Sequence, residues 1–196
     1  QIDVNMDHIH NEIDDLNSLI KNMDLSNDDD YEKQLLKVNN ETIIERTIRL
    51  LKQNGIKSEN ILISSNSTLF DNLNVKRVSN PNNNFVHGSD MKERTGYWLD
   101  AFYPTDYPTC YIFGDVYYSP EAIKLIVNSA TNDFLMFGTD VRNCNRPIKN
   151  HDEPLAFKVV DQEMFKQGIK SVKELYNLGK TNRHPLVWEL YRYLCG

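Results

Sequence analysis

One acidic residue stands where an open α/β sheet would bind a ligand. Asp115 follows the apolar run 109–113, with Gly114 between them. In open α/β sheets ligands bind beyond the carboxyl ends of the strands, where a carboxylate can hold Mg²⁺ beside phosphate groups. The glycine would let a ligand approach the backbone closely. A turn aspartate that caps the next connection fits the same pattern equally well, so both interpretations stay open.

The elements that would position Asp115 alternate along residues 33–196. Apolar runs predict strands at 35–38, 60–64, 109–113, 134–137 and 155–160, and residues 66–88 are mostly loop with a short strand at 75–78. Apolar periodicity predicts helices over 41–54, 91–102, from 120 onward, 162–176 and 185–194. Continuous apolar strands that alternate with helices are typical of a sheet covered on both faces. We therefore predict an α/β fold, with a mostly parallel open sheet and helices on both faces.

Several of these helices carry local boundary signals. Gly55 is a C-terminal stop for the helix over 41–54, and Ser119 followed by Pro120 is a typical helix start. In the last helix Trp188, Tyr191 and Tyr193 are aromatic residues whose simplest interpretation is core packing.

The N-terminal region has a different character from the body. Residues 1–24 carry a strict heptad pattern of apolar residues: Ile2, Met6, Ile9, Ile13, Leu16, Ile20 and Met23. Such a narrow seam is typical of a coiled-coil helix, so we predict a homo-oligomer formed through residues 2–23. The alternative is that this helix packs on its own domain. Residues 25–32 are predicted to be an acidic linker and residues 33–196 the main domain.

Composition limits the classes of partner. The 196 residues carry a net charge of −6, but residues 1–32 hold ten acidic residues and one lysine, which leaves +3 for the rest. A mildly basic body suits a phosphorylated substrate, whereas the acidic total argues against a nucleic-acid partner. No apolar run approaches the length of a membrane span, and three cysteines without paired spacing are typical of reduced thiols. We expect a cytoplasmic protein with no membrane contact.

Four segments resemble the sugar-phosphate nucleotidyltransferases, a family with a nucleotide-diphospho-sugar transferase-like fold. The segments are Lys33-Gln34-Leu35-Leu36-Lys37-Val38-Asn39 followed by Glu41-Thr42-Ile43-Ile44-Glu45-Arg46-Thr47, the step Gly114-Asp115, the stretch Glu153 to Val159, and the ending His184 to Arg192. The resemblance covers residues 33–196, and its first block is the most specific part.

The resemblance implies a reaction and a set of residues. A substrate phosphate would attack the α-phosphate of a nucleoside triphosphate, with Mg²⁺ as cofactor and a small phosphorylated molecule as acceptor. By the match, Lys33 would contact phosphate and Asp115 would hold the metal, although Lys33 could equally be a surface lysine. Gly88, Ser89, Thr95 and Gly114 would contact the substrate.

Two parts of the family pattern are not found in residues 1–196. Members open with a strand and a glycine-rich loop ending in arginine, and they carry a second metal-binding aspartate late in the chain. Here no glycine precedes Gly55. Either the natural chain holds further residues, or the protein is a non-catalytic relative. We expect the first, because the missing strand would be central in the sheet and its loss would leave two neighbours unpaired.

Three classes of function therefore remain open. The first is a magnesium-dependent nucleotidyltransferase. The second is a glycosyltransferase that uses a nucleotide-sugar donor, but such enzymes usually present an Asp-x-Asp pair, and this chain has Asp115-Val116-Tyr117. The third is a non-catalytic oligomeric assembly protein that keeps the same fold.

Overall fold

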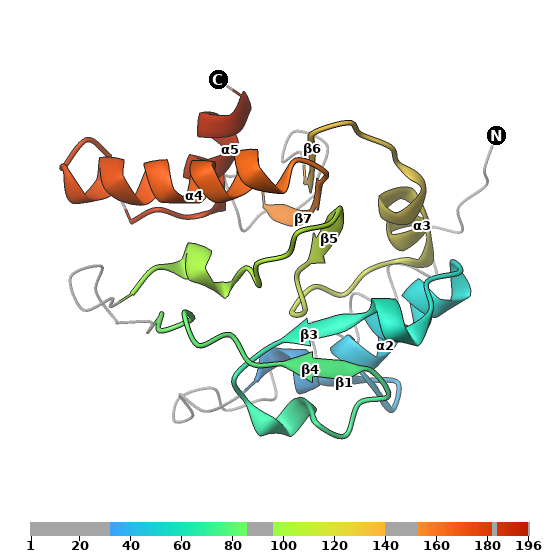
Figure 1. Cartoon of the computed structure of the whole chain (residues 1–196). Coiled ribbons are helices and arrows are strands. Elements are labelled where there is room, and N and C mark those ends of the chain that lie inside the picture. Colours follow the sequence, from blue (N-terminus) through green and yellow to red (C-terminus); the bar gives the residue numbers. More distant parts are fainter. Residues whose placement is uncertain (1–31, 86–95, 140–152, 182–183, 196) are drawn as a thin grey trace, which may run out of the picture.

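The computed structural model describes residues 32–85, 96–139, 153–181 and 184–195 (Figure 1). The predicted coiled-coil helix over 1–24 and nearly all of the linker lie outside these residues. The helices are α2 (Ile43–Gln53), α3 (Pro120–Asn128), α4 (Gln162–Asn177) and α5 (Val187–Cys195). The strands are β1 (Lys37–Val38), β2 (Glu41–Thr42), β3 (Leu62–Ser64), β4 (Lys76–Val78), β5 (Thr109–Ile112), β6 (Phe134–Gly138) and β7 (Pro154–Val159). Among the described residues, no helix has the length and apolar character needed to cross a membrane.

The strands form three small sheets, so the prediction of a mostly parallel open sheet is wrong. Strand β7 lies between β5 and β6 and is antiparallel to both, while β3 and β4 form a separate parallel pair. The predicted mixture of strands and helices is confirmed. The error has a physical cause. A continuous apolar run predicts that both faces of a strand are buried, but it does not predict whether the strand is parallel or antiparallel to its neighbours. In the middle of its sheet, β7 meets that condition in an antiparallel arrangement.

The first predicted strand, over 35–38, is divided between two elements. Lys33–Leu35 form a 3₁₀ turn (η1), and β1 then pairs with β2 in a tight hairpin. Asn39 and Asn40 occupy the turn with φ values of 52° and 65°. A two-residue hairpin of this kind requires positive φ at both positions, which asparagine tolerates better than most residues.

Local capping defines most helix boundaries, as predicted. Thr42 and Glu45 form a reciprocal capping box at the start of α2, and Gly55 follows its end with φ 87°. The Ser119 hydroxyl accepts a hydrogen bond from the Ala122 amide at 3.1 Å, one residue before Pro120 begins α3. Helices α4 and α5 also confirm the predictions to within two residues at each end.

The predicted helix over 91–102 is wrong where the structure describes it. Residues Trp98–Ala101 form only a 3₁₀ turn (η4). Gly96 precedes this turn with φ 70°, and a Cβ atom there would lie 2.6 Å from the Asn84 carbonyl oxygen. The left-handed backbone and the close packing against residue 84 prevent a regular α-helix from running through this position.

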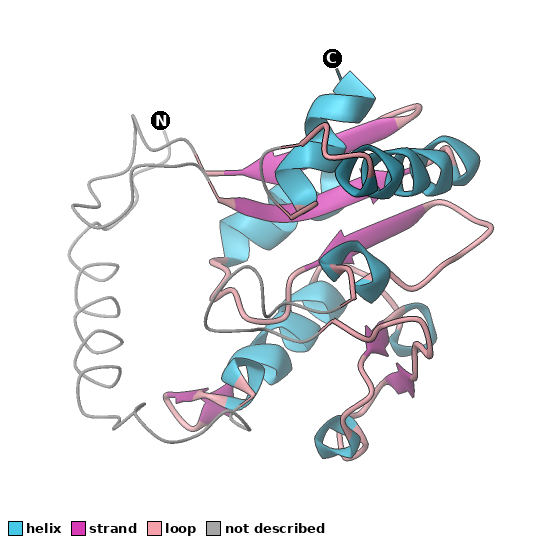
Figure 2. Ribbon diagram, turned by 90° about the vertical axis from the view of Figure 1, so that its left-hand side faces the viewer, coloured by secondary structure: helices cyan, strands magenta, loops and turns pink. Residues whose placement is uncertain are grey.

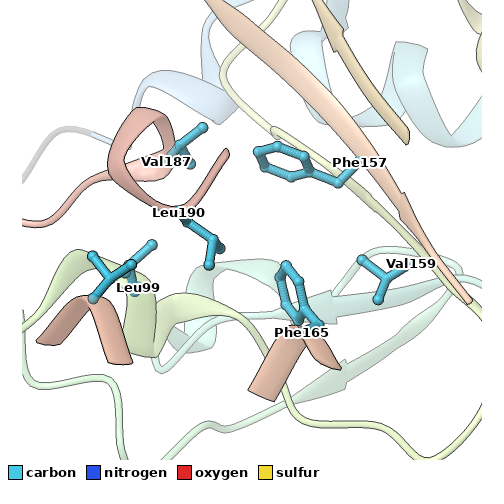
Figure 3. Packing of buried hydrophobic residues seen from close by; sticks show 7 residues of the cluster. Leu99, Phe157, Val159, Phe165, Val187 and Leu190 are labelled. Carbon is cyan, nitrogen blue, oxygen red and sulfur yellow. The ribbon is translucent and has the colours of Figure 1, made fainter. Parts of the chain in front are cut away.

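Two hydrophobic clusters define two lobes. The larger lobe comprises η4, β5, β6, β7, α4 and α5, and its core is drawn in Figure 3. Its seven buried members are Leu99, Phe157, Val159, Phe165, Val172, Val187 and Leu190. The prediction that the aromatic residues of α5 pack in the core is partly wrong. Trp188 and Tyr191 are half-buried, while Tyr193 is 46 % exposed.

The smaller lobe comprises α2, β3 and β4. Its buried members are Ile44, Ile48, Ile61, Ile63 and Phe70. A third cluster links the lobes, since it joins Leu50 of α2 to Ile123 and Ile126 of α3 and to Ala156 of β7. In Figures 1 and 2 the larger lobe lies above and the smaller lobe below, with α3 at their junction.

Candidate functional site

A groove of about 1630 Å³ separates the two lobes. Its walls include every residue of β3 and β5, together with parts of η1, α2 and the segment that leads into α3. By contrast, Val78 is the one residue of β4 that lines it, and no residue of β6 does. Strand β7, the sheet partner of β5, also contributes Pro154, Leu155 and Lys158, so the groove borders both strands of the β5–β7 ladder as well as β3.

Lys33 and Asp115 line this groove together, although they are far apart in the sequence. Both side chains are exposed. The 3₁₀ turn that carries Lys33 rests on the turn that carries Asp115, because a Cβ atom on Gly114 would lie 3.1 Å from Cγ of Gln34. The absence of a side chain at Gly114 thus admits Gln34, a packing role that differs from the predicted approach of a ligand.

A second carboxylate lies at the same end of the β5–β7 ladder as Asp115. The ladder between β5 and β7 pairs Ile112 with Ala156, and the Phe113 amide then donates to the Leu155 carbonyl at 3.2 Å. The ladder ends there, because Gly114 and Asp115 form a turn and Glu153 bonds to Thr139, whose amide donates to the Glu153 carbonyl at 2.9 Å. Asp115 and Glu153 both line the groove. Sequence reasoning missed the site position of Glu153, because the pairing of β5 with β7 was not foreseen.

The segment after Asp115 is fixed by α2 on one side and β7 on the other. The Arg46 guanidinium lies 4.3 Å from the centre of the Tyr117 ring, and its Nε donates to the Tyr118 carbonyl at 3.1 Å. The buried Tyr118 hydroxyl donates to the Leu155 carbonyl at 2.6 Å. Burial raises the pKa of Tyr118, and the nearby charge of Asp115 raises it further. Tyr118 therefore acts as a neutral hydrogen-bond donor that ties the Asp115 segment to β7.

One buried acceptor in the groove wall has no partner among the described residues. The Gln34 Oε1 atom is buried and accepts no hydrogen bond from that part of the chain. An unsatisfied acceptor of this kind costs free energy unless a water molecule or a ligand donates to it. Its residue lines the groove next to Lys33 and packs on Gly114.

The carboxylates suit a hard cation better than a soft one. Among the described residues, no three His, Cys, Asp or Glu side chains converge as a complete metal site. Mg²⁺ is commonly held by one or two carboxylates, with water and substrate phosphates completing its coordination. Asp115 and Glu153 fit that smaller set, since both are carboxylates at the same end of one strand ladder.

The remaining predicted site residues have different outcomes. Gly88, Ser89 and Thr95 lie outside the described residues, so their contact with substrate stays a prediction. Sequence reasoning assigned no role to Gln34 and Glu153, which line the groove, or to Arg46, which fixes the segment after Asp115. Arg46 and Gln34 belong to the block that carries the family resemblance, which was the available signal. Comparison of the chain with family models, curated proteins and solved structures finds no match.

Proposed function

We propose that the protein is a magnesium-dependent nucleotidyltransferase that acts on a nucleoside triphosphate and a small phosphorylated acceptor, such as a sugar phosphate. The observation that carries the proposal is the shared position of Lys33 and Asp115 in one groove, with Gln34 packed on Gly114. A basic and an acidic group in one groove, the acidic one just after the end of β5, suit a triphosphate and its metal ion.

The proposed reaction is an in-line displacement. An oxygen of the acceptor phosphate forms a bond to the α-phosphorus, and the bond from that phosphorus to the bridging oxygen of pyrophosphate breaks. The Lys33 ammonium would bind phosphate oxygens, and Asp115 with Glu153 would hold Mg²⁺. When bound, the ion would neutralise the negative charge of the phosphates. The chain's own part is mainly to position the two substrates.

Calorimetric titration of each nucleoside triphosphate with Mg²⁺ tests the proposal. We expect one nucleotide to bind, Asp115→Asn to abolish binding, and Lys33→Met to weaken it by about tenfold. Asp106→Asn is the matched control, because Asp106 is an exposed acid paired with Lys166 outside the groove. Unchanged binding by Asp115→Asn, or equal losses in both Asp variants, would overturn the site assignment.

A second candidate function is that of a non-catalytic assembly protein, and one observation favours it. In the part of the chain that the structure describes, β3 pairs with β4 alone and β5 with β7 alone. Each strand keeps one unpaired edge, which can recruit another polypeptide. This candidate predicts that no nucleoside triphosphate binds, and that deletion of residues 1–24 dissociates a stable multimer, as seen by light scattering.

A further inference from the structure

We propose that Arg46 of α2 is a positioning residue, which fixes the place of the Asp115 carboxylate by holding the backbone that follows it. The inference rests on the proposed function, because it takes Asp115 as the metal ligand. It goes beyond that function by naming a side chain that does not line the groove and on which the metal site depends.

The place of the Asp115 carboxylate depends on the backbone on each side of it. The carboxylate is exposed and has no hydrogen bond or ion pair among the described residues. On the N-terminal side, the Phe113 amide donates to the Leu155 carbonyl at 3.2 Å. On the C-terminal side, Arg46 holds the backbone, since its Nε donates to the Tyr118 carbonyl at 3.1 Å. The ends of the Asp115 turn are therefore held by two different elements, β7 and α2.

Arg46 contacts two consecutive residues of this segment. Besides its hydrogen bond to the Tyr118 carbonyl, its guanidinium lies 4.3 Å from the centre of the Tyr117 ring. The first contact holds a main-chain atom, and the second holds the side chain of the preceding residue. A guanidinium can make both contacts because it is planar, stacks on aromatic rings and donates from its edge. A lysine ammonium has no flat face, so it cannot reproduce the two contacts together.

The helix that carries Arg46 is packed firmly in the fold. Ile44 and Ile48 stand two residues before and two residues after Arg46, and both are buried in the cluster of the smaller lobe. Leu50 of the same helix packs with Tyr118 in the third cluster, which links the lobes. Arg46 therefore holds the segment after Asp115 against a helix that is itself fixed in two clusters.

Tyr118 connects the Arg46 contact to both carboxylates of the proposed metal site. Its hydroxyl donates to the Leu155 carbonyl at 2.6 Å, two residues after Glu153. Burial raises the pKa of Tyr118 and the Asp115 charge raises it further, so the Asp115 carboxylate lies near this ring. A shift of the Tyr118 backbone would therefore move Asp115 relative to Glu153. Loss of a residue that orients a metal ligand typically weakens metal binding by about 10–100-fold.

Titration of the full 196-residue chain with Mn²⁺ tests the proposal. Mn²⁺ replaces Mg²⁺ because both prefer oxygen ligands, and the paramagnetic resonance signal of the free ion measures binding. Arg46→Lys keeps the positive charge and removes the planar group, so a change in affinity reports geometry and not charge. We expect about tenfold weaker Mn²⁺ binding. Arg192→Lys is the matched control and should have no effect, because Arg192 pairs with Glu189 on α5, outside the groove.

Two variants of Tyr117 test the ring contact without a change at Arg46. Tyr117→Phe keeps the aromatic face, whereas Tyr117→Leu keeps an apolar side chain without that face. We expect Mn²⁺ affinity to be retained with phenylalanine and to fall about tenfold with leucine. The double variant Arg46→Lys, Tyr117→Leu should lose little more than either single variant, because both changes break the same contact. Affinities are compared at a temperature at which circular dichroism shows every variant folded.

Three results would overturn the proposal. They are unchanged Mn²⁺ affinity in Arg46→Lys, equal losses in Arg46→Lys and Arg192→Lys, and equal affinities of the two Tyr117 variants. Any of them, together with loss of Mn²⁺ binding in Asp115→Asn, rejects Arg46 as a positioning residue and keeps Asp115 as the metal ligand. Mn²⁺ binding that survives Asp115→Asn, or no binding by the unmodified chain, rejects the metal site of the proposed function and this inference with it.

Discussion

The two lobes differ in how completely their hydrophobic clusters are enclosed. In the larger lobe the buried cluster residues are 0–2 % exposed, and rings such as Phe134, Phe157 and Phe165 stack on one another. In the smaller lobe the cluster residues are 3–9 % exposed. The larger lobe therefore has a closed core, while the smaller lobe has a cluster with one side still open.

The groove accounts for this difference. None of the seven core residues of the larger lobe lines it, whereas all five from the smaller lobe do. The same side chains that hold α2 against β3 thus form a wall of the candidate site. In the larger lobe the buried core residues are therefore different from the residues that line the groove, whereas in the smaller lobe the same residues do both. Five experiments examine that contrast.

The largest effect is expected from truncating the closed core. Phe157 is fully buried, so Phe157→Ala should lower the free energy of unfolding by about 3–5 kcal/mol. Ile63→Ala should cost about 2 kcal/mol, because its site already borders solvent on the groove side. Guanidinium unfolding of both variants measures the difference. If Ile63→Ala lowered the free energy of unfolding more than Phe157→Ala, the conclusion that the larger lobe has the more enclosed core would be contradicted.

Among the glycines that the structure describes, Gly96 should be the one whose replacement by alanine is most damaging. Its φ of 70° strains an alanine, and the new Cβ would lie 2.6 Å from the Asn84 carbonyl oxygen. We expect a loss of about 3 kcal/mol, from left-handed strain together with the displaced backbone. Gly179→Ala provides the control, since it has φ 66° and no atom within 4 Å of the new Cβ. Similar unfolding midpoints for the two variants would exclude the steric part of the explanation.

The groove thiol should react slowly at neutral pH. Because the pKa of Cys110 is raised to about 11, its thiolate fraction rises with pH throughout the range below that value. In the variant that keeps Cys110 as its single cysteine, alkylation should accelerate about tenfold per pH unit between pH 8 and 10. A rate that levels off near pH 9 would show that the wall of the groove is more open than described.

Matched helix caps test whether the lobes unfold together. Gly55 ends α2 in the smaller lobe and Gly179 ends α4 in the larger one, and both have positive φ and open space around a new Cβ. Each Gly→Ala change should cost about 1 kcal/mol through left-handed strain alone. We expect equal shifts in one cooperative transition, because the third cluster joins the lobes. A separate early transition in Gly55→Ala would show that the smaller lobe opens by itself.

The smallest effect concerns a surface ion pair of the smaller lobe. Arg49 donates two hydrogen bonds to Glu41, at 2.7 Å each, and this pairing lowers the pKa of Glu41 below its ordinary value of 4.5. The pair therefore stabilises the fold above that pH, and the contribution disappears as pH falls through the lowered pKa. Glu41→Gln should cost less than about 1 kcal/mol at pH 7, because both side chains are partly exposed. The cost should shrink as the pH falls below 4.5, and a cost that persists in acid would assign it to packing.

Local signals in the sequence determined the helices. Thr42 with Glu45, Ser119 with Pro120, and Gly55 define boundaries through hydrogen bonds and backbone angles within a few residues. Such interactions need no distant partner, so the sequence predicts them well. The strands at 62–64, 134–138 and 154–159 were also found as apolar runs, and the strand at 76–78 was expected as a short strand within a loop, although the directions of these strands were not predicted.

Tertiary structure alone decided which strands pair and which residues share a groove. The antiparallel place of β7 puts Glu153 at the same end of the β5–β7 ladder as Asp115, and Lys33, next to the Gln34 that packs on Gly114, lines the same groove. These contacts join segments that are far apart in the chain. Apolar periodicity predicts which face of an element is buried, but it does not predict which other element packs on that face. The sequence therefore determined the separate elements and their ends, while long-range packing decided the open edges of β3 and β5 and the groove between them.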